Sequence, residues 1–267
     1  MNRTLIQKPD IKALRKLGFS CVDMHYHTTH SDGSAKIGDI LDKARKMEIG
    51  IAITDHNEIS GAVEAMKYSN VLVIPGIEVN CAEGPDIILY FYNLKDLEDF
   101  FNKHVKNYRN KDLYGRTKIP FKEIITKAKK YKCVIAAPHP CGSAWKDLKT
   151  FLQNTNLNYL LKDIQALEMI NGEQFMKNNL KAIEWNQKLK KGISGGSDGH
   201  CLFELGSIVT CSKASTVKDF LDSIIKRKTD VIGKKFFLPY YILPGLVSLK
   251  NHLRFGIPWF AFKKRGW

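Results

Sequence analysis

The sequence predicts an α/β barrel, and three observations support this fold class. Short apolar runs typical of buried strands alternate along the chain with amphipathic helical stretches. This alternation is typical of a parallel sheet that is covered by helices. Polar, chemically active residues stand at the end of nearly every predicted strand. A barrel brings such strand ends together at one mouth, whereas an open sheet gathers its ligands in a single crevice.

The first half of the chain contains the first four predicted strands. A short helix near 11–17 precedes a strand at 21–27, and residues 37–47 place apolar side chains at helical spacing between Arg and Lys. A run of four apolar or small residues from Gly50 begins the next strand. The elements that follow are a strand at 50–54, a helix at 60–68, a strand at 71–74 that continues at 77–80, and a strand at 86–92.

The second half repeats the alternation. The apolar run 133–137 ends at Pro138, which is typical of a buried strand that stops at a turn. The elements expected here are helices at 95–108, 121–130, 174–190 and 216–228, with strands at 133–137, 166–170, 192–195 and 207–211. We expect three segments: a lead-in at 1–19, one catalytic domain at 20–229 and a C-terminal extension at 230–267.

The first strand carries a metal-ligand pattern. His25 and His27 are two residues apart, which places both imidazoles on the same face of a strand. Asp32 follows in a loop beside Gly33, where the chain can turn its carboxylate back toward the strand end. Two imidazoles and a nearby carboxylate suit zinc, manganese or iron.

Further candidate ligands stand at the ends of other strands. With the first strand they use five of the eight histidines in the chain. Imidazoles and carboxylates gathered without a cation would be costly to bury, so metal ions are the better explanation. The additional candidates are His56, Glu78, His139, Asp198 and His200.

Composition limits the partners and the compartment. The formal net charge is +15 and the pI is about 9.4, which favours partners that carry phosphate, such as nucleotides, nucleic acid or anionic lipid. The six cysteines form no C-x-x-C pair, so we expect buried thiols in a cytoplasmic protein. The first twenty residues lack the apolar core of a secretory signal, and no apolar run is long enough to span a bilayer. Nothing in the sequence indicates a protein partner.

Five motifs together resemble the polymerase and histidinol phosphatase (PHP) superfamily of metal-dependent phosphoesterases. The resemblance covers about residues 20–212, with the motifs in the order of that family. It implies a distorted seven-stranded (β/α) barrel with a centre of two or three divalent metal ions. The motifs are His25-Tyr26-His27-Thr28 with Ser31-Asp32-Gly33, Thr54-Asp55-His56-Asn57, Pro75-Gly76-Ile77-Glu78, Pro138-His139-Pro140 and Ser197-Asp198-Gly199-His200.

The resemblance also implies a role for each motif residue in catalysis. His25, His27, Glu78 and Asp198 would hold the first metal, and Glu78 would bridge to a second metal that His139 also binds. A third metal would be held by Asp32, His56 and His200.

One position departs from the family. Many members begin the strand after the bridging glutamate with a histidine, where this chain has Asp86. A carboxylate can bind a hard ion and favours Mn²⁺ or Mg²⁺ over Zn²⁺, or it leaves the second site weak. The identity of the ions, among Mn, Zn, Fe and Mg, therefore stays open.

Four further residues are candidates for substrate binding. Arg116 and Lys118 lie in a basic loop, where they could bind a phosphate or be solvated. Asn171 follows a strand and could meet the sugar or base of a substrate, or cap a helix at a turn. His30 lies between two motif elements and could orient a ligand, contact substrate or be a loop histidine.

The C-terminal extension is basic and rich in aromatic residues. Residues 234–267 contain no Asp or Glu, and three prolines interrupt any single long helix. The extension could cover the barrel, lie on an anionic membrane surface, or bind RNA or other single-stranded nucleic acid. A membrane contact would make this cytoplasmic protein peripheral at a membrane.

The function expected from these features is hydrolysis of phosphate esters by a metal-bound hydroxide. The positive charge favours nucleotides or short oligonucleotides, so the substrate would be a phosphorylated small molecule or a nucleic-acid end. One alternative is a phosphatase for histidinol phosphate or another small metabolite. An alternative from another class is a non-catalytic, metal-stabilised module that binds nucleic acid or a membrane surface.

Overall fold

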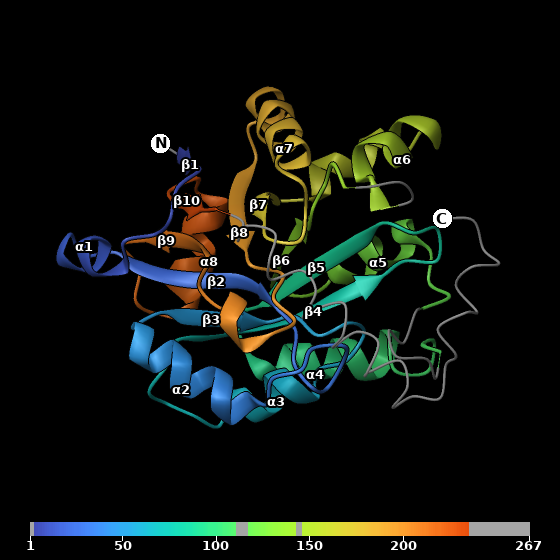
Figure 1. The fold of residues 1–267 in the computed structure, drawn as a ribbon. Helices are drawn as coiled ribbons and strands as arrows, with labels where there is room; N and C mark the ends of the chain where they lie inside the picture. Colours follow the sequence, from blue (N-terminus) through green and yellow to red (C-terminus); the bar gives the residue numbers. More distant parts are fainter. Residues whose placement is uncertain (1–2, 111–116, 143–145, 235–267) are drawn as a thin grey trace, which may run out of the picture.

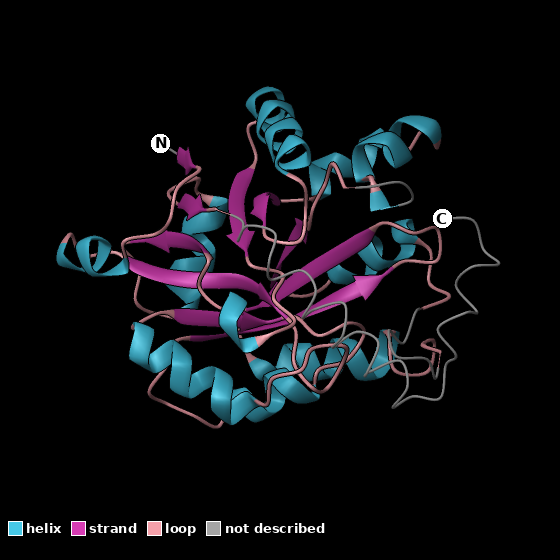
Figure 2. Ribbon diagram, in the orientation of Figure 1, coloured by secondary structure: helices cyan, strands magenta, loops and turns pink. Residues whose placement is uncertain are grey.

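A single ten-stranded sheet curls through the molecule, with most helices packed on its outer side and the helix Val217–Ile225 packed against its inner side. The computed structural model describes residues 3–110, 117–142 and 146–234. Figure 1 shows the curvature of the sheet, and Figure 2 shows that the strands form an inner layer beneath the helices. The strand order is β1-β10-β9-β2-β3-β4-β5-β6-β7-β8.

The elements agree closely with the alternation predicted from the sequence. The strands are β1 Arg3–Leu5, β2 Ser20–Tyr26, β3 Gly50–Ile53, β4 Val73–Asn80, β5 Asp86–Phe91, β6 Cys133–Ala137, β7 Ala166–Asn171, β8 Gly192–Gly196, β9 Ile208–Ser212 and β10 Asp230–Gly233. The α-helices are α1 Ile11–Lys16, α2 Ile37–Met47, α3 Ser60–Ala65, α4 Leu94–His104, α5 Phe121–Ala128, α6 Leu148–Asn154, α7 Met176–Leu189 and α8 Val217–Ile225. Helix α6 was not expected from the sequence.

Two expectations about the sheet were wrong. The sheet has ten strands rather than seven, in part because the short segments β1 and β10 pair with each other in parallel and join it through β9. The sheet is also mixed rather than parallel. Only residues 81–85 separate β4 from β5, which is too short for a crossover, so these two strands form an antiparallel hairpin. Strand β5 is antiparallel to β6 as well, and β9 is antiparallel to β2.

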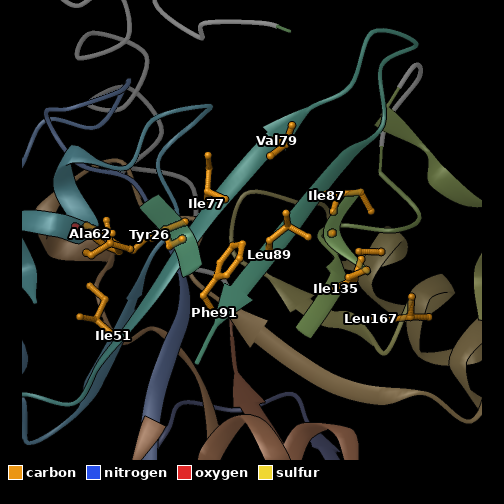
Figure 3. Packing of buried hydrophobic residues seen from close by; sticks show 14 of the residues in the cluster. Tyr26, Ile51, Ala62, Ile77, Val79, Ile87, Leu89, Phe91, Ile135 and Leu167 are labelled. Carbon is orange, nitrogen blue, oxygen red and sulfur yellow. The ribbon is translucent and has the colours of Figure 1, made fainter. Parts of the chain in front are cut away.

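Side chains alternate across the sheet between two apolar regions. The outer region packs against the helices, and Figure 3 shows Ile77, Val79, Ile87 and Leu89 on neighbouring strands of this layer. The inner region is smaller and is packed by Phe220, with two further apolar residues of α8. The inner side chains are Val22, Met24, Ala52, Ile74, Ile88, Tyr90, Val134, Ala136 and Ala166.

The inner face changes from apolar to polar along the strands. On β4, Ile74 is followed four residues later by the buried carboxylate of Glu78. Strand β5 runs the other way, so its first residue, Asp86, lies beside Asn80 at the same end. We call this polar end of the barrel the mouth. An apolar floor beneath it fixes the ligand side chains in place.

Strand β8 returns to β2 and closes the curl at the mouth. Asp198 N donates to His25 O at 2.8 Å, and His27 N donates to Gly199 O at 3.0 Å. Gly196 makes this approach possible, because a Cβ atom there would lie 2.3 Å from His25 N.

Gly196→Ala should therefore destabilise the fold by about 2–3 kcal/mol or more, because the clash is with backbone that cannot move aside. Urea unfolding of the metal-free protein measures this change in the free energy of unfolding. Gly38→Ala is the matched control, since a Cβ atom at Gly38 meets nothing within 4 Å. Equal stability of the two variants would contradict the close approach.

The predicted C-terminal extension lies outside the described residues from residue 235 onward, and so does Arg116. Within the part that is described, no helix is long and apolar enough to cross a membrane.

Candidate metal centre

Nine ligand-type side chains converge at the mouth, and all but His200 are buried. They come from strands and strand ends that are distant in sequence, and they form three groups, two of which share His27. In each group the possible ligand atoms lie within 4.8 Å of one another. The groups are His25, His27 and Asp198; His27, Asp32, His56 and His200; and Glu78, Asp86 and His139.

The first group has the tightest geometry. The Nε2 atoms of His25 and His27 lie 3.1 Å apart, and Asp198 Oδ1 lies 3.2 Å from the first and 3.0 Å from the second. Glu78 Oε2 lies 3.4 Å from both nitrogens. Four donor atoms therefore face one point: His25 and Glu78 lie on β2 and β4, and His27 and Asp198 lie just after β2 and β8.

The second group lies on the other side of His27. Asp32 Oδ2 is 3.1 Å from His200 Nε2 and 3.7 Å from His56 Nε2, and Asp32 Oδ1 is 3.6 Å from His27 Nδ1. Glu78 Oε2 is 2.9 Å from His56 Nδ1, so one glutamate contacts both groups. Asp32, which the sequence placed in a loop able to turn back, does reach the strand end.

The third group differs from the other two because a lysine side chain pairs with one of its carboxylates. Glu78 Oε1 is 3.3 Å and Asp86 Oδ2 is 3.7 Å from His139 Nε2. The Lys146 ammonium lies 2.9 Å from Asp86 Oδ2. No sequence pattern marked Lys146 as part of the centre.

The donor set fits divalent ions. Donors around an ion with bonds of about 2.1 Å stand about 3.0 Å apart in octahedral and about 3.4 Å apart in tetrahedral geometry, which matches the first group. Three buried atoms, His27 Nδ1, Glu78 Oε1 and His139 Nδ1, make no hydrogen bond within the described residues. Buried polar atoms of this kind are costly unless a ligand satisfies them.

Two buried aspartates hold the loops that carry the ligands. Asp55 accepts hydrogen bonds from Thr28 N, Thr28 Oγ1 and Ser31 Oγ, which fixes the loop leading to Asp32. Asp23 accepts from Ser197 N and Ser197 Oγ in the same way, beside Asp198. Burial raises the pKa of Asp23 to about 6, against the lowering effect of its hydrogen bonds.

The backbone at two ligands is strained. His139 has φ of 30° and Asp198 has φ of 51°, a region that residues other than glycine rarely adopt. Such strain persists where the surroundings enforce it, and it is common at functional sites. The hydrogen bond from His139 N to Glu168 Oε2 at 2.8 Å, and that from Asp198 N to His25 O, provide this constraint.

Glu168 is a site residue that the sequence reasoning missed. His25 Nδ1 lies 3.1 Å from Glu168 Oε1, so this nitrogen donates and leaves Nε2 free of its proton to bind a cation. A carboxylate in the middle of the apolar run Ala-Leu-Glu-Met-Ile was the signal that could have revealed it.

Glu168→Gln should weaken Mn²⁺ binding about 10–100-fold, because the amide no longer selects this tautomer of His25. Equilibrium dialysis against Mn²⁺ measures the dissociation constant. Glu64→Gln is the control, since Glu64 pairs with His30 at 3.0 Å outside the three groups. An unchanged affinity in Glu168→Gln would remove Glu168 from the centre.

Three histidines of the centre have a raised pKa in the metal-free protein, whereas burial and the neighbouring His56 and His200 lower the pKa of His27. Burial lowers the pKa of His25, but Asp198 and two neighbouring glutamates outweigh it and hold the pKa well above its ordinary value. The pKa of His200 is likewise held well above its ordinary value, because Asp32 outweighs the effect of burial. The pKa of His56 is raised for the same reason, by Glu78 and Asp32.

Metal binding at pH 7 should therefore release about two or more protons, because ligands bind in their deprotonated form. Three histidines with an ordinary pKa of about 6.5 would together release fewer than about one proton at this pH. Titration calorimetry in two buffers of different ionisation enthalpy measures the number. The stabilisation that these raised pKa values give to the metal-free fold is complete below about pH 6.5 and is lost as the pH rises through the raised values. Release of less than one proton would contradict the assignment.

The remaining predicted site residues take different positions. Asn171 is wholly buried, and its Nδ2 atom donates to Asp198 Oδ2 at 3.0 Å and to Glu168 Oε2 at 2.8 Å. This places it behind the ligands, where it orients Asp198. His30 lies in the loop that carries Asp32, and its side chain is 31% exposed. Lys118 is exposed, next to Thr117, whose hydroxyl donates to Asn80 O at the mouth end of β4.

Comparison with known proteins agrees with this geometry. The sequence profile of the PHP domain matches residues 23–238. An uncharacterized protein of Methanocaldococcus jannaschii is 28% identical over 228 residues, which is 80% of this chain and 82% of that protein. A short segment of 68 residues is 38% identical to the DNA polymerase III subunit alpha of Borreliella burgdorferi, covering 23% of this chain and 6% of that protein.

Two solved structures share the fold. A two-domain protein from Bacteroides vulgatus that contains a predicted PHP-like metal-dependent phosphoesterase superposes with a TM-score of 0.59 at 17% identity, over 94% of this chain and 74% of that one. A lesion-specific endonuclease from Pyrococcus furiosus superposes with a TM-score of 0.63 at 19% identity, over 80% of this chain and 57% of that one. The profile match over most of the sequence shows that the chain belongs to the PHP domain family, as its motifs predicted, and that it is a hydrolase of phosphate esters with a metal-binding centre.

Proposed function

We propose that the protein hydrolyses phosphate esters of nucleotides or short oligonucleotides. The observation that carries the proposal is the convergence of nine nitrogen and oxygen ligands at one mouth, in a chain with a formal net charge of +15. An endonuclease Q of the same fold, solved with a duplex substrate that has an abasic lesion at the active site, supports the nucleic-acid class. That protein is 18% identical to this chain, so the substrate is the part of the proposal that needs a test.

The roles of the ligands follow from their contacts. His25, His27 and Asp198 would hold one ion, and Asp32, His56 and His200 would hold another, with Glu78 between the two groups. Bound divalent ions would supply hydroxide at neutral pH and neutralise charge on the phosphoryl group. The donor set admits Mn, Zn, Fe or Mg. The buried groups fix these positions before a substrate arrives, so little reorganisation is needed during the reaction.

We assign His30 to the leaving group. Its Nε2 atom lies 3.0 Å from Glu64 Oε2, which orients the ring in the loop that carries Asp32. A partly exposed imidazole can deliver a proton to the departing oxygen and receive another from solvent. The exposed Lys118 would attract the phosphate of an incoming substrate, and its neighbour Thr117 bonds to the mouth end of β4.

The test is phosphate release from a panel of substrates with Mn²⁺, Mg²⁺ or Zn²⁺. The panel contains nucleoside mono- and bisphosphates, short RNA and DNA, histidinol phosphate and an aryl phosphate. We expect the highest kcat/KM with a nucleotide or oligonucleotide. Equal or better turnover of histidinol phosphate or the aryl phosphate would contradict the proposed substrate class. An absence of turnover with every ion would contradict catalysis and favour a binding module.

A further inference from the structure

The lysine in the third ligand group sets that group apart from the other two. Asp86 is the first residue of β5, and its side chain is fully buried, while the Lys146 side chain is 29% exposed. The Lys146 side chain therefore contacts a buried carboxylate while part of it remains accessible to solvent. The ion pair spans 2.9 Å, and it lies beside the His139 imidazole, which is 3.7 Å from the same carboxylate oxygen.

An ammonium and a divalent cation compete for the same oxygen atoms. Lys146 Nζ lies 2.9 Å from Asp86 Oδ2, and that oxygen is 3.7 Å from His139 Nε2, so the positive charge stands beside the ligand atoms of the third group. An ion held between Glu78, Asp86 and His139 would lie close to this positive charge, where repulsion is strong because the surroundings are buried. The Lys146 ammonium already neutralises the buried Asp86 carboxylate, so a metal ion would gain little free energy by binding there.

We propose that the Lys146 ammonium takes the place of the metal ion that Glu78 and His139 would otherwise share, so that the centre binds two divalent ions rather than three and uses Lys146 to bind a phosphoryl oxygen of the substrate. The number of ions is independent of the reaction, whereas the contact with substrate rests on the proposed function. Lys146 has the features of a phosphate-binding residue. Its ammonium is held in place by a buried carboxylate 2.9 Å away, and its partial exposure lets a substrate reach it.

The number of bound ions tests the first part without any turnover. Protein dialysed against Mn²⁺ is analysed by mass spectrometry of the metal content. The wild-type protein should hold two ions, Lys146→Gln should hold three because Asp86 becomes available, and Lys146→Arg should hold two. Three ions in the wild-type protein, or an equal number in wild type and Lys146→Gln, would overturn the proposal. If a variant fails to fold, the number of ions bound by the wild-type protein still tests the proposal.

Binding of inorganic phosphate tests the second part. Calorimetry of the manganese-loaded protein should show phosphate binding about tenfold or more weaker in Lys146→Gln, with Lys146→Arg restoring part of it. Lys188→Gln is the matched control, because Lys188 is an exposed lysine on α7 that pairs with Glu184. Unchanged phosphate affinity in Lys146→Gln would overturn this part. Because neither measurement requires hydrolysis, a failure of the proposed reaction is seen separately, as an absence of turnover in the substrate panel.

Discussion

Replacing His25 or Asp198 with alanine should lower phosphate release by about 10³-fold or more. Each residue contributes a donor to the tightest ligand group, and Asp198 Oδ1 lies 3.0–3.2 Å from two imidazole nitrogens. A bound divalent ion lowers a phosphoryl-transfer barrier by several kcal/mol, and each 1.36 kcal/mol is about tenfold in rate. The measurement is the initial rate on the best substrate of the panel, together with the number of bound ions.

The controls separate loss of a ligand from loss of the fold. His104→Ala removes a histidine of α4 that contacts Tyr131 instead of the centre, and Asp42→Ala removes a carboxylate that is 70% exposed. Both variants should retain full activity and the full number of ions. A His25→Ala or Asp198→Ala variant that is folded, by circular dichroism, and retains more than about a tenth of the activity would refute the metal centre.

Glu78→Gln should have an effect of the same size, and it should also remove at least one bound ion. Its carboxylate contacts four imidazoles, with distances of 2.9 Å to His56, 3.4 Å to His25 and His27, and 3.3 Å to His139. An amide keeps the shape of the side chain but loses the negative charge that would attract the ions. Its NH₂ group donates hydrogen bonds and cannot bind a cation. The loss in rate should again be about 10³-fold.

Two measurements together test the prediction for Glu78→Gln. Metal content shows whether an ion has left, and single-turnover kinetics with excess Mn²⁺ shows whether the remaining centre can still react. Glu184→Gln, an exposed variant on α7 whose side chain is 70% exposed, serves as the control. If Glu78→Gln retained its ions and its rate, the glutamate would not lie between two ions, and the two ligand groups would have to act separately.

The motifs predicted which side chains gather at the mouth, because residues at strand ends obey a local rule. An imidazole or carboxylate that follows a buried strand must lie at a strand end, and in a curled sheet the strand ends converge. His56 and His139 could be recognised by this rule alone, before the residues around them were known. The sequence could not show that β5 runs antiparallel, and so Asp86 entered the argument through a family resemblance rather than through geometry. The reversal is what carries the first residue of β5 to the mouth.

The residues that were missed act through distant partners. Glu168 is separated by 143 residues from His25, and no spacing in the sequence reveals such a pair. Lys146 comes from a connection between β6 and α6 that has no periodic pattern. Short strands are missed for a related reason: β1 and β10 are stabilised by pairing with each other across almost the whole chain, and a segment of three or four residues carries too little pattern to be recognised alone.

The return of β8 to β2 has a consequence for the order in which the molecule folds. His27 and Asp198 are 171 residues apart in sequence, yet they belong to one ligand group. The β4–β5 hairpin that carries Glu78 and Asp86 is local, so its contacts form at little cost in chain entropy, whereas the seam between β2 and β8 must wait for nearly the whole chain. A nascent chain that ends before β8 therefore lacks Asp198, the carboxylate of the tightest group, and holds only its two imidazoles. An ion held by His27 and Asp198 would link the two sides of the last seam to form. Chelation should therefore release that seam first, which amide hydrogen exchange at His27 and Asp198 would detect.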